Sequence, residues 1–495
     1  YPSTPPSTSL MFMQSNGGLT DAALFQGKDS ILSGPAGGVV GAVQTSRQAG
    51  YDRVIGFDMG GTSTDVSHYR GEYERVFETE VAGVRLRAPM MAIYTVAAGG
   101  GSIVSFDGSR YRVGPESAGA YPGPACYRHG GPLAVTDCNV MVGKLQPEFF
   151  PHVFGPEGDL PLDADVLCQK FVALAEEIQS STGDARSPEQ VAAGFLSIAV
   201  EKMANAIKKI SVQRGYDVSD YVLCSFGGAG GQHACLIADA LGMTEVFLHP
   251  YAGVLSAYGM GLADVRSLNE RSVELPLEEA TLAEIQQVVE SLASKGLEEL
   301  AQQGFALDLE SKIQNSKLPQ VLPRLLLKYE GTDSTLAVDF AGVEAMRSQF
   351  TTLHRQRYGF AQADKRLIVD TAAVEVIGHT HSPDEPDVPR VRAQPLTPKT
   401  TVPVYTAEAW HDTPVYHRED LCPGDAIAGP ALVIEPTGTN VVEPGWKATL
   451  TAKGHLILKK DASQISFVGF ASGKTVDHSP AEISSTHATA LSPSS

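Results

Sequence analysis

The 495-residue sequence lacks the features that mark several broad classes of protein. It contains no run of roughly 18 apolar residues, so no membrane-spanning helix is predicted. Its six cysteines lie far apart and form no Cys-X-X-Cys pair, which argues against a zinc site or a disulfide framework. The first residues, Tyr1 to Pro6, include neither an initiator methionine nor the charged and apolar regions of a signal peptide. We therefore expect a chain that starts inside a longer protein.

Positive charge is also scarce. The formal net charge is −19, and a strongly acidic chain repels the phosphate backbone of nucleic acids, so we expect no nucleic-acid partner. A nucleotide ligand is still compatible with this charge, because a local group of backbone N–H donors can bind phosphate in an acidic protein. Free thiols in a chain of this length indicate a reducing compartment, so the predicted location is cytoplasmic.

Periodicity and turn residues predict an α/β protein with several domains. Helices are predicted over about 188–213, 252–264 and 279–303, and a strand over 221–226. Residues 96–131 are rich in glycine and show little periodicity, so we expect structured loops at 97–102 and 114–127, and a loop of this length is often functional.

Composition and turns divide the chain into five predicted parts: 1–50; 51–265, which contains two glycine-rich loops; 266–382, an additional α+β region; 383–465, a small β-rich C-terminal module; and 466–495, a disordered tail.

The strongest chemical signal follows the short apolar strand that ends near Phe57. The segment reads Gly56-Phe-Asp-Met-Gly-Gly-Thr-Ser-Thr-Asp65. Glycines let the backbone approach phosphate oxygens, and three hydroxyls add donors. Asp58 can hold Mg²⁺ through water, since this ion keeps most of its hydration shell, and Asp65 could orient a hydroxyl or a water. The candidate catalytic residues are Asp58 and Asp65, with Asp58 also the metal ligand, and the candidate nucleotide-binding residues here are Gly60, Gly61, Thr62, Ser63 and Thr64. The alternative is a plain β-turn with a polar rim.

A second glycine-rich loop follows the 221–226 strand and opens a helix. It reads Phe226-Gly-Gly-Ala-Gly-Gly-Gln-His, and its candidate nucleotide-binding residues are Gly227, Gly228, Ala229, Gly230 and Gly231. Alone this signal is weak, because such a loop also serves close packing of a strand against a helix. It is not a P-loop, since no Lys-Ser/Thr pair follows.

The order of these segments is more informative than either loop. A Gly/Ala helix (33–42), the loop 58–65, the loop 227–231 and a second Gly/Ala helix (252–264) follow one another. This order resembles the second half of the actin-like ATPase (ribonuclease H-like) fold, in which two loops hold phosphate and adenosine and two small-residue helices cross between the lobes. The resemblance implies that residues 1–50 are the end of a first lobe and a crossing helix, and that residues 51–265 are the second lobe with the phosphate and adenosine loops.

More narrowly, the chain resembles the hydantoinase A/5-oxoprolinase family. The segments that carry the resemblance are LSGPAGGVVGA (32–42), GFDMGGTSTDVS (56–67), VAAGGGS (96–102), VGPESAGAYPGPACYRHGGPLAVTD (113–137), FGGAGGQHA (226–234), YEGTD (329–333), RYGF (357–360) and VVEPGW (441–446). The resemblance implies ATP and Mg²⁺ as cofactors and ATP-driven opening of the lactam of 5-oxo-L-proline to L-glutamate. It also implies a hydantoinase B-like half or subunit as a partner, and a homodimer in the full-length enzyme.

The chain departs from the family pattern in two places. The family carries an acidic, glycine- and threonine-rich phosphate loop near its N-terminus, but no such loop precedes residue 33 here. The long enzymes of the family continue into a hydantoinase B-like half, and this sequence contains no such half. We therefore expect a fragment that lacks both. Two alternatives stay open: an N-methylhydantoinase or the nucleotide-binding subunit of a carboxylase, and an inactive truncated chain.

Several weaker candidates lie in the same segments. Cys126 could be a nucleophile or a buried apolar residue, and His233 could touch a ligand or cap a helix. Glu116 and Asp137 could be acid–base groups or loop-holding acids. Three lysines of the 188–213 helix could reach a ribose or phosphate or could simply be solvated; they are Lys202, Lys208 and Lys209.

Overall fold

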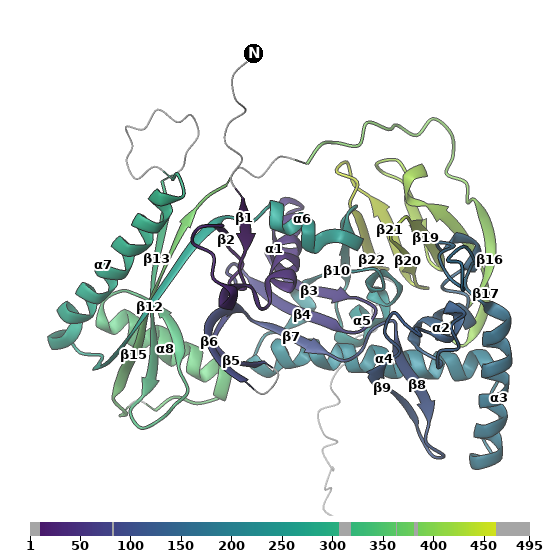
Figure 1. The fold of residues 1–495 in the computed structure, drawn as a ribbon, viewed down its shortest axis with the longest axis horizontal. Coiled ribbons are helices and arrows are strands. Elements are labelled where there is room, and N and C mark those ends of the chain that lie inside the picture. The colour runs from purple at the N-terminus through teal and green to yellow at the C-terminus, as the bar shows by residue number, and fades with distance from the viewer. Residues whose placement is uncertain (1–9, 82–83, 306–317, 363, 381–384, 462–495) are drawn as a thin grey trace, which may run out of the picture.

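The computed structural model describes residues 10–81, 84–305, 318–362, 364–380 and 385–461. It shows an α/β fold with mixed sheets, in which a central sheet lies between a helix-backed sheet on one side and a small β-sheet on the other (Figure 1). Within these ranges, no helix combines the length and the apolar character needed to cross a membrane. The predicted disordered tail, 466–495, lies outside the described residues.

The central sheet has eight strands and is part parallel and part antiparallel. Its three middle strands, β11, β10 and β3, run parallel, and β4 pairs antiparallel with β3. In spatial order the strands are β18 (Ala426–Ala428), β21 (Trp446–Leu450), β22 (Leu456–Lys460), β11 (Glu245–Leu248), β10 (Val222–Phe226), β3 (Arg53–Met59), β4 (Thr64–Arg70) and β7 (Ile93–Val96).

Strand β3 shows why the sheet is covered on both faces. Ile55 and Phe57 belong to one apolar core, and Val54 belongs to a second core on the opposite face, as the two-residue period of a strand requires. The helices that pack on the first face include α4 (Pro188–Ile210) and α5 (Ala234–Leu241), and those on the second are α1 (Ser33–Gln48) and α6 (Leu255–Gly261) (Figure 1).

Helices α1 and α6 cross at a point where only glycine fits. A Cβ added to Gly259 would lie 2.0 Å from the carbonyl oxygen of Gly37 and 2.4 Å from the backbone nitrogen of Gly41. Both distances are far below van der Waals contact, so the small residues of the two predicted Gly/Ala helices serve this close approach. Helix α6 is shorter than the predicted 252–264, because residues Ala252–Val254 form a 3₁₀ turn, η7, before it.

A second sheet of six strands carries the additional α+β region. Its order is β1 (Met11–Met13), β2 (Leu19–Asp21), β12 (Val265–Pro276), β15 (Leu367–Gly378), β13 (Gln320–Tyr329) and β14 (Leu336–Asp339). Helices α7 (Glu279–Gln302) and α8 (Val343–Tyr358) pack against it through a separate apolar core. The N-terminal strands β1 and β2 therefore join this sheet, since Leu19 pairs with Val265.

The C-terminal segment is divided between two sheets. Strands β16 (Thr400–Thr406), β17 (Ala409–His417), β19 (Ala431–Glu435) and β20 (Gly438–Val442) form their own four-stranded sheet. Strands β18, β21 and β22 instead extend the central sheet, with β22 antiparallel to β11. The described part of the segment 383–465 is rich in strands, but three of these strands belong to the central sheet and not to a separate module. The domain boundaries themselves stay predictions.

The glycine-rich segment 96–131 is more regular than its composition suggested. It contains the hairpin of β8 (Ser102–Phe106) and β9 (Tyr111–Ser117), so the predicted loop 114–127 was wrong for residues 114–117, which belong to β9. The Asp107 carboxylate accepts the N–H groups of Ser109 and Arg110 and closes the hairpin turn. Tyr111 stacks on Phe195 of α4, which anchors the hairpin to the core.

The remaining elements connect these layers. They are the ribbon of β5 (Arg75–Val81) and β6 (Val84–Met91), the helices α2 (Val135–Met141) and α3 (Ala164–Thr182), and the 3₁₀ turns η1 (Gly27–Ser30), η2 (Ala125–Tyr127), η3 (Pro147–Phe149), η4 (Val212–Arg214), η5 (Val218–Asp220), η6 (Gly230–Gln232) and η8 (Arg418–Asp420).

Candidate functional site

The β3–β4 hairpin brings the two candidate acids face to face. Asp58 and Asp65 are paired across the antiparallel strands, so their side chains project from the same face of the sheet. The turn between the strands is formed by Gly60 to Ser63, and Gly60 donates its N–H to the carbonyl of Ser63 at 3.1 Å. The sequence motif thus forms a short turn with an acid at each end.

Burial makes both acids reluctant to ionise, and the charge of Asp65 adds to this effect at Asp58. Burial, followed by the nearby charge of Asp65, raises the pKa of Asp58 to about 6, although a 3.4 Å hydrogen bond from the Ser256 hydroxyl opposes the shift. Burial also raises the pKa of Asp65, against a 2.6 Å hydrogen bond from Thr95. Two carboxylates with raised pKa values are the arrangement that a bound cation would relieve.

Three consecutive glycines, Gly99 to Gly101, pack against this turn. Gly100 donates its N–H to the carbonyl of Gly60 at 3.1 Å, and Gly101 donates to Gly61 at 2.5 Å. A Cβ on Gly99 would lie 2.7 Å from the backbone nitrogen of Ser63. Sequence reasoning used this run only as part of a family motif. Its position beneath the turn shows that it fixes the shape of the candidate phosphate loop.

Thr64 differs from the other hydroxyl residues of the motif. Its side chain is fully buried, and its hydroxyl donates to the carbonyl of Ala98 at 2.5 Å. Thr62 is exposed and Ser63 is partly exposed. Because neighbouring residues of a strand point to opposite faces, Thr64 must point into the core when Asp65 points out of it.

The second glycine loop lies directly against the first acid. Gly227 has a φ of +80°, and a Cβ there would lie 2.5 Å from Oδ1 of Asp58. Ala229 donates its N–H to the carbonyl of Met59 at 3.1 Å. Two predicted sites that are far apart in sequence are therefore neighbours, because β3 and β10 are adjacent parallel strands whose carboxyl ends meet.

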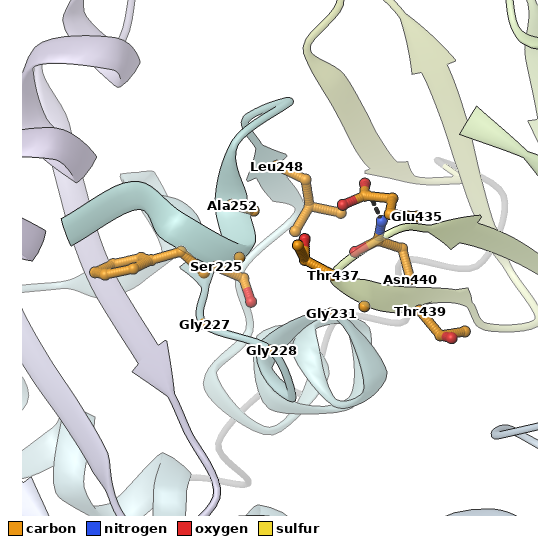
Figure 2. A pocket seen from close by; sticks show the side chains of 13 residues that line it. Ser225, Gly227, Gly228, Gly231, Leu248, Ala252, Glu435, Thr437, Thr439 and Asn440 are labelled. Carbon is orange, nitrogen blue, oxygen red and sulfur yellow. Dashed lines mark hydrogen bonds between the residues drawn. The ribbon is translucent and has the colours of Figure 1, made fainter. Parts of the chain in front are cut away.

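A pocket separates this loop from the turn between β19 and β20. Figure 2 shows Glu435, Thr437 and Asn440 gathered on one side of the pocket and the backbone of Gly227 and Gly228 on the other. The residues that line it are Ser225, Phe226, Gly227, Gly228, Gly231, Leu248, Ala252, Gly253, Glu435, Thr437, Gly438, Thr439 and Asn440. The β19–β20 residues were missed by sequence reasoning, since their segment shows no motif beyond Pro/Gly turns.

Two glycines of the second loop are explained by packing within the protein. A Cβ on Gly231 would lie 2.1 Å from Oδ1 of Asn440, and one on Gly230 would lie 2.7 Å from the Ser225 hydroxyl. Both glycines are buried, whereas Gly227 and Ala229 are partly exposed and Gly228 is exposed. The alternative interpretation of this loop, close packing of backbone, thus accounts for its second half.

Asp137 and Cys126 form a structural unit in the Gly/Pro-rich segment. The Asp137 carboxylate accepts the N–H groups of Ala125 and Cys126 at 2.9 Å each and that of Ala134 at 2.8 Å. Cys126 is fully buried, and burial followed by the Asp137 charge raises the pKa of its thiol. A thiol held in its neutral form is a poor nucleophile, so this geometry favours a buried apolar role for Cys126 and a loop-holding role for Asp137.

The other weak candidates are not among the residues that line the pocket. His233 is buried, burial and then Lys144 lower its pKa to about 3, and it contacts Asn139 at 3.2 Å. Glu116 is exposed on β9. Lys202 donates to the carbonyl of Val113, Lys209 lies over the ring of Tyr94, and Lys208 is on the same helix.

One cluster outside the predicted residues has the composition of a metal site. His249, Glu385 and His455 place their ligand atoms within 4.8 Å of one another, and all are buried. The Glu385 carboxylate accepts one hydrogen bond from Nε2 of His249, at 2.7 Å, and another from Nε2 of His455, at 2.6 Å. However, Nδ1 of His249 accepts the N–H of Tyr251 at 3.1 Å, so its Nε2 carries the proton. A histidine that binds a metal through Nε2 would instead donate a hydrogen bond from Nδ1. Because Nδ1 of His249 accepts one, this cluster is a hydrogen-bonded triad.

The fold and the two glycine loops define an α/β protein with a candidate nucleotide site, and comparison with known proteins supplies the family. Residues 3–269 match the hydantoinase/oxoprolinase family model, and residues 276–461 match that of the hydantoinase/oxoprolinase C-terminal domain. The chain belongs to the hydantoinase/oxoprolinase family, as its motifs predicted.

Relatives with known names include 5-oxoprolinases. The chain is 41% identical to 5-oxoprolinase 1 of Arabidopsis thaliana over 90% of this chain and 36% of that protein. It is 40% identical to 5-oxoprolinase of Saccharomyces cerevisiae over 94% of this chain and 36% of that protein. The chain thus spans about a third of the length of these relatives.

Two solved structures share the fold. The ATP-dependent caprolactamase from Pseudomonas jessenii superposes with a TM-score of 0.80 at 28% identity, covering 91% of this chain and 65% of the other. Nucleotide-free acetone carboxylase superposes with a TM-score of 0.67 at 25% identity, covering 91% of this chain and 64% of the other. The α/β fold with mixed sheets is therefore shared with both of these proteins.

Proposed function

We propose that this chain is the nucleotide-binding part of an ATP-dependent cyclic amide hydrolase that opens 5-oxo-L-proline to L-glutamate. The observation that carries the proposal is the contact of Gly227 with Asp58, which unites two glycine loops and a pair of opposed acids at the carboxyl ends of adjacent strands. The names of the relatives support the substrate, and the ATP-dependent caprolactamase supports the use of ATP.

We also propose that residues 51–265 are an actin-like ATPase lobe. The crossing of α1 and α6 through Gly37, Gly41 and Gly259 supports this, because small-residue helices cross between the lobes of that fold. The proposed partner is a hydantoinase B-like half or subunit, and the proposed full-length assembly is a homodimer. A cytoplasmic location stays a prediction.

Within the proposed site, Asp58 would hold Mg²⁺ through water, and Asp65 would orient a water or hydroxyl. The phosphates would lie against the exposed and half-exposed backbone of Gly60, Gly61, Thr62 and Ser63 and of Gly227, Gly228 and Ala229. Thr64, Gly230 and Gly231 would shape the site from behind, since each is buried. Two raised carboxylate pKa values fit a cation, because its charge would favour both ionised forms.

The chemistry demands positioning and neutralisation of charge rather than covalent participation of the protein. ATP would supply the phosphoryl group that activates the lactam oxygen and turns it into a leaving group. The glycine turns would orient the phosphates, and the two acids would hold the cation and water in place. These contributions need rigid backbone, which the hydrogen bonds from Gly100 and Gly101 to the turn provide.

A second candidate function is that of another ATP-dependent member of the family. The similarity to nucleotide-free acetone carboxylase favours a carboxylase subunit, and an N-methylhydantoinase would use the same loops. A chain that binds nucleotide without turnover is a third possibility.

Titration calorimetry of Mg²⁺–ATP into the chain tests nucleotide binding. We expect binding by the unchanged chain and loss of binding in Asp58→Ala and Gly228→Val. Asp184→Ala removes an exposed acid elsewhere and serves as the matched control. Equal ATP affinity in all three variants would exclude the proposed site.

Phosphate release by the complex reconstituted with a hydantoinase B-like subunit then identifies the substrate. Stimulation by 5-oxoproline supports the proposed function, whereas stimulation by hydantoins or ketones supports the second candidate. Turnover by the chain alone would exclude the third.

A further inference from the structure

Three polar side chains form a row across neighbouring strands of the central sheet at the candidate site. Thr95 of β7 pairs with Asp65 of β4, and Asp65 pairs in turn with Asp58 of β3 (Figure 1). Residues that are paired directly across antiparallel strands project from the same face of the sheet, with Cβ atoms about 5 Å apart. The register therefore places the Thr95 hydroxyl beside Asp65, on the side that faces away from Asp58.

The Thr95 hydroxyl fixes one oxygen of Asp65. It donates a hydrogen bond of 2.6 Å to Oδ1 of this carboxylate. A hydrogen bond to an ionised acceptor is stronger than one between neutral groups, so this contact restricts the rotation of the Asp65 side chain.

Ser256 makes the corresponding contact with the other acid. Its hydroxyl, on helix α6, donates a hydrogen bond of 3.4 Å to Oδ2 of Asp58. The space for this hydroxyl depends on Gly38 of α1, because a Cβ at residue 38 would lie 2.9 Å from Oγ of Ser256. The hydrogen bond from Ser256 is longer than the one from Thr95, so we expect it to hold its acid less firmly.

The two hydroxyls matter because the two acids face each other. Like charges on directly paired residues repel, so carboxylates without these contacts would turn away from each other. Thr95 and Ser256 each hold one oxygen, and within the described residues no hydrogen bond reaches the other two, Oδ2 of Asp65 and Oδ1 of Asp58. Oδ1 of Asp58 is also the oxygen that lies over Gly227, where an added Cβ would be 2.5 Å away. It therefore lies where the two glycine loops meet.

We propose that Thr95 and Ser256 are positioning residues, which hold one oxygen of each acid so that the other can accept hydrogen bonds from the water that hydrates a bound Mg²⁺. The inference rests on the proposed function, because the cation belongs to the proposed ATP site. A carboxylate that is already oriented loses less freedom when the hydrated cation binds. Each hydroxyl acts only through its acid, so its loss should weaken the contribution of Mg²⁺ to ATP binding and leave the binding of metal-free ATP unchanged.

Titration calorimetry of ATP, with Mg²⁺ and with a chelator, separates these two contributions. The Mg²⁺ enhancement is the ratio of the dissociation constant in chelator to that in Mg²⁺. We expect Thr95→Val to lower this ratio by about three- to tenfold and Ser256→Ala to lower it by about two- to threefold, since its hydrogen bond is longer. Thr95→Ser keeps a hydroxyl and should retain most of the enhancement. The matched controls are Thr401→Val on β16 and Ser294→Ala on α7, which each remove an exposed hydroxyl.

The outcomes distinguish this inference from the proposed function. An unchanged Mg²⁺ enhancement in Thr95→Val would overturn the role of Thr95, and one in Ser256→Ala would overturn that of Ser256. An equal loss of ATP affinity with and without Mg²⁺ would also overturn it, because a merely structural role has that effect. Absence of ATP binding, or of any Mg²⁺ enhancement, in the unchanged chain would instead refute the proposed function. Should Thr95→Val fail to fold, Thr95→Ala removes the same hydroxyl and must give the same loss.

Discussion

Asp58→Asn should make the ligand-free chain more stable while it removes Mg²⁺–ATP binding. In the folded chain, burial and the facing Asp65 disfavour the ionised form of Asp58. An amide of the same shape removes the charge, can still accept the hydrogen bond from Ser256, and cannot replace a carboxylate near a cation. The prediction therefore separates a functional acid from a structural one, because a structural acid would stabilise the fold.

The magnitude follows from the pKa of Asp58, which rises from 3.8 to about 6 on folding. At 1.36 kcal/mol per pKa unit, ionised Asp58 costs the folded chain about 3 kcal/mol. The sign depends on pH. Below about pH 4 the carboxyl is protonated in both states and the cost is absent; it grows as the pH rises to about 6 and is constant above that. The variant should thus match the unchanged chain at low pH and exceed its stability at neutral pH.

Urea unfolding in the presence of a chelator, at about pH 3.5 and pH 7.5, measures this difference. Asp184→Asn is the control, because that acid is exposed and no burial opposes its charge. A variant less stable than the unchanged chain at pH 7.5 would refute the reasoning, since it would show that the Asp58 carboxylate is held by favourable contacts.

Three further predictions concern stability. Gly259→Ala should destabilise the chain by about 1–3 kcal/mol or more in urea unfolding, because its Cβ would meet the Gly37 carbonyl; an unchanged midpoint would contradict this crossing. Lys144→Met should cost about 3–5 kcal/mol, because it leaves the Glu443 carboxylate buried without a counter-charge, with only the hydrogen bond from Thr406, and Glu443→Gln in addition should recover part of the loss. Glu385→Gln should cost up to about 3 kcal/mol above about pH 4.5, because hydrogen bonds from two histidines outweigh burial and lower its pKa to about 2; denaturant titrations should show this difference shrinking as the pH falls.

The β3–β4 hairpin shows which features of the site the local sequence pattern can predict. A strand, an acid and a double glycine predicted a loop over 58–65, and the turn occupies Gly60–Ser63 of it, whereas Asp58 lies on β3 and Asp65 on β4. The same two-residue period should have separated Thr64 from Asp65, because adjacent strand residues face opposite ways. The prediction that the hydroxyls of Thr62, Ser63 and Thr64 all face the phosphates did not take this alternation into account, and Thr64 is buried.

The second loop shows what the local sequence pattern cannot predict, namely which group contacts the glycines. Glycine indicates that something approaches the backbone closely, but not whether it is a ligand or another part of the chain. For Gly231 it is Asn440, and for Gly253 it is Thr437, whose hydroxyl would lie 2.2 Å from an added Cβ. No spacing in the sequence connects residues of these two segments.

The sequence by itself determined the family, the two Gly/Ala helices and the two loops, because each depends on residues close together in the chain. Only the tertiary structure decided that β18, β21 and β22 complete the central sheet, that Gly227 adjoins Asp58, and that Glu435 faces the glycine loop. The physical reason is that side-chain pattern specifies which faces are buried and which backbone conformations are allowed. The partner that buries each face is selected by the packing of the whole chain.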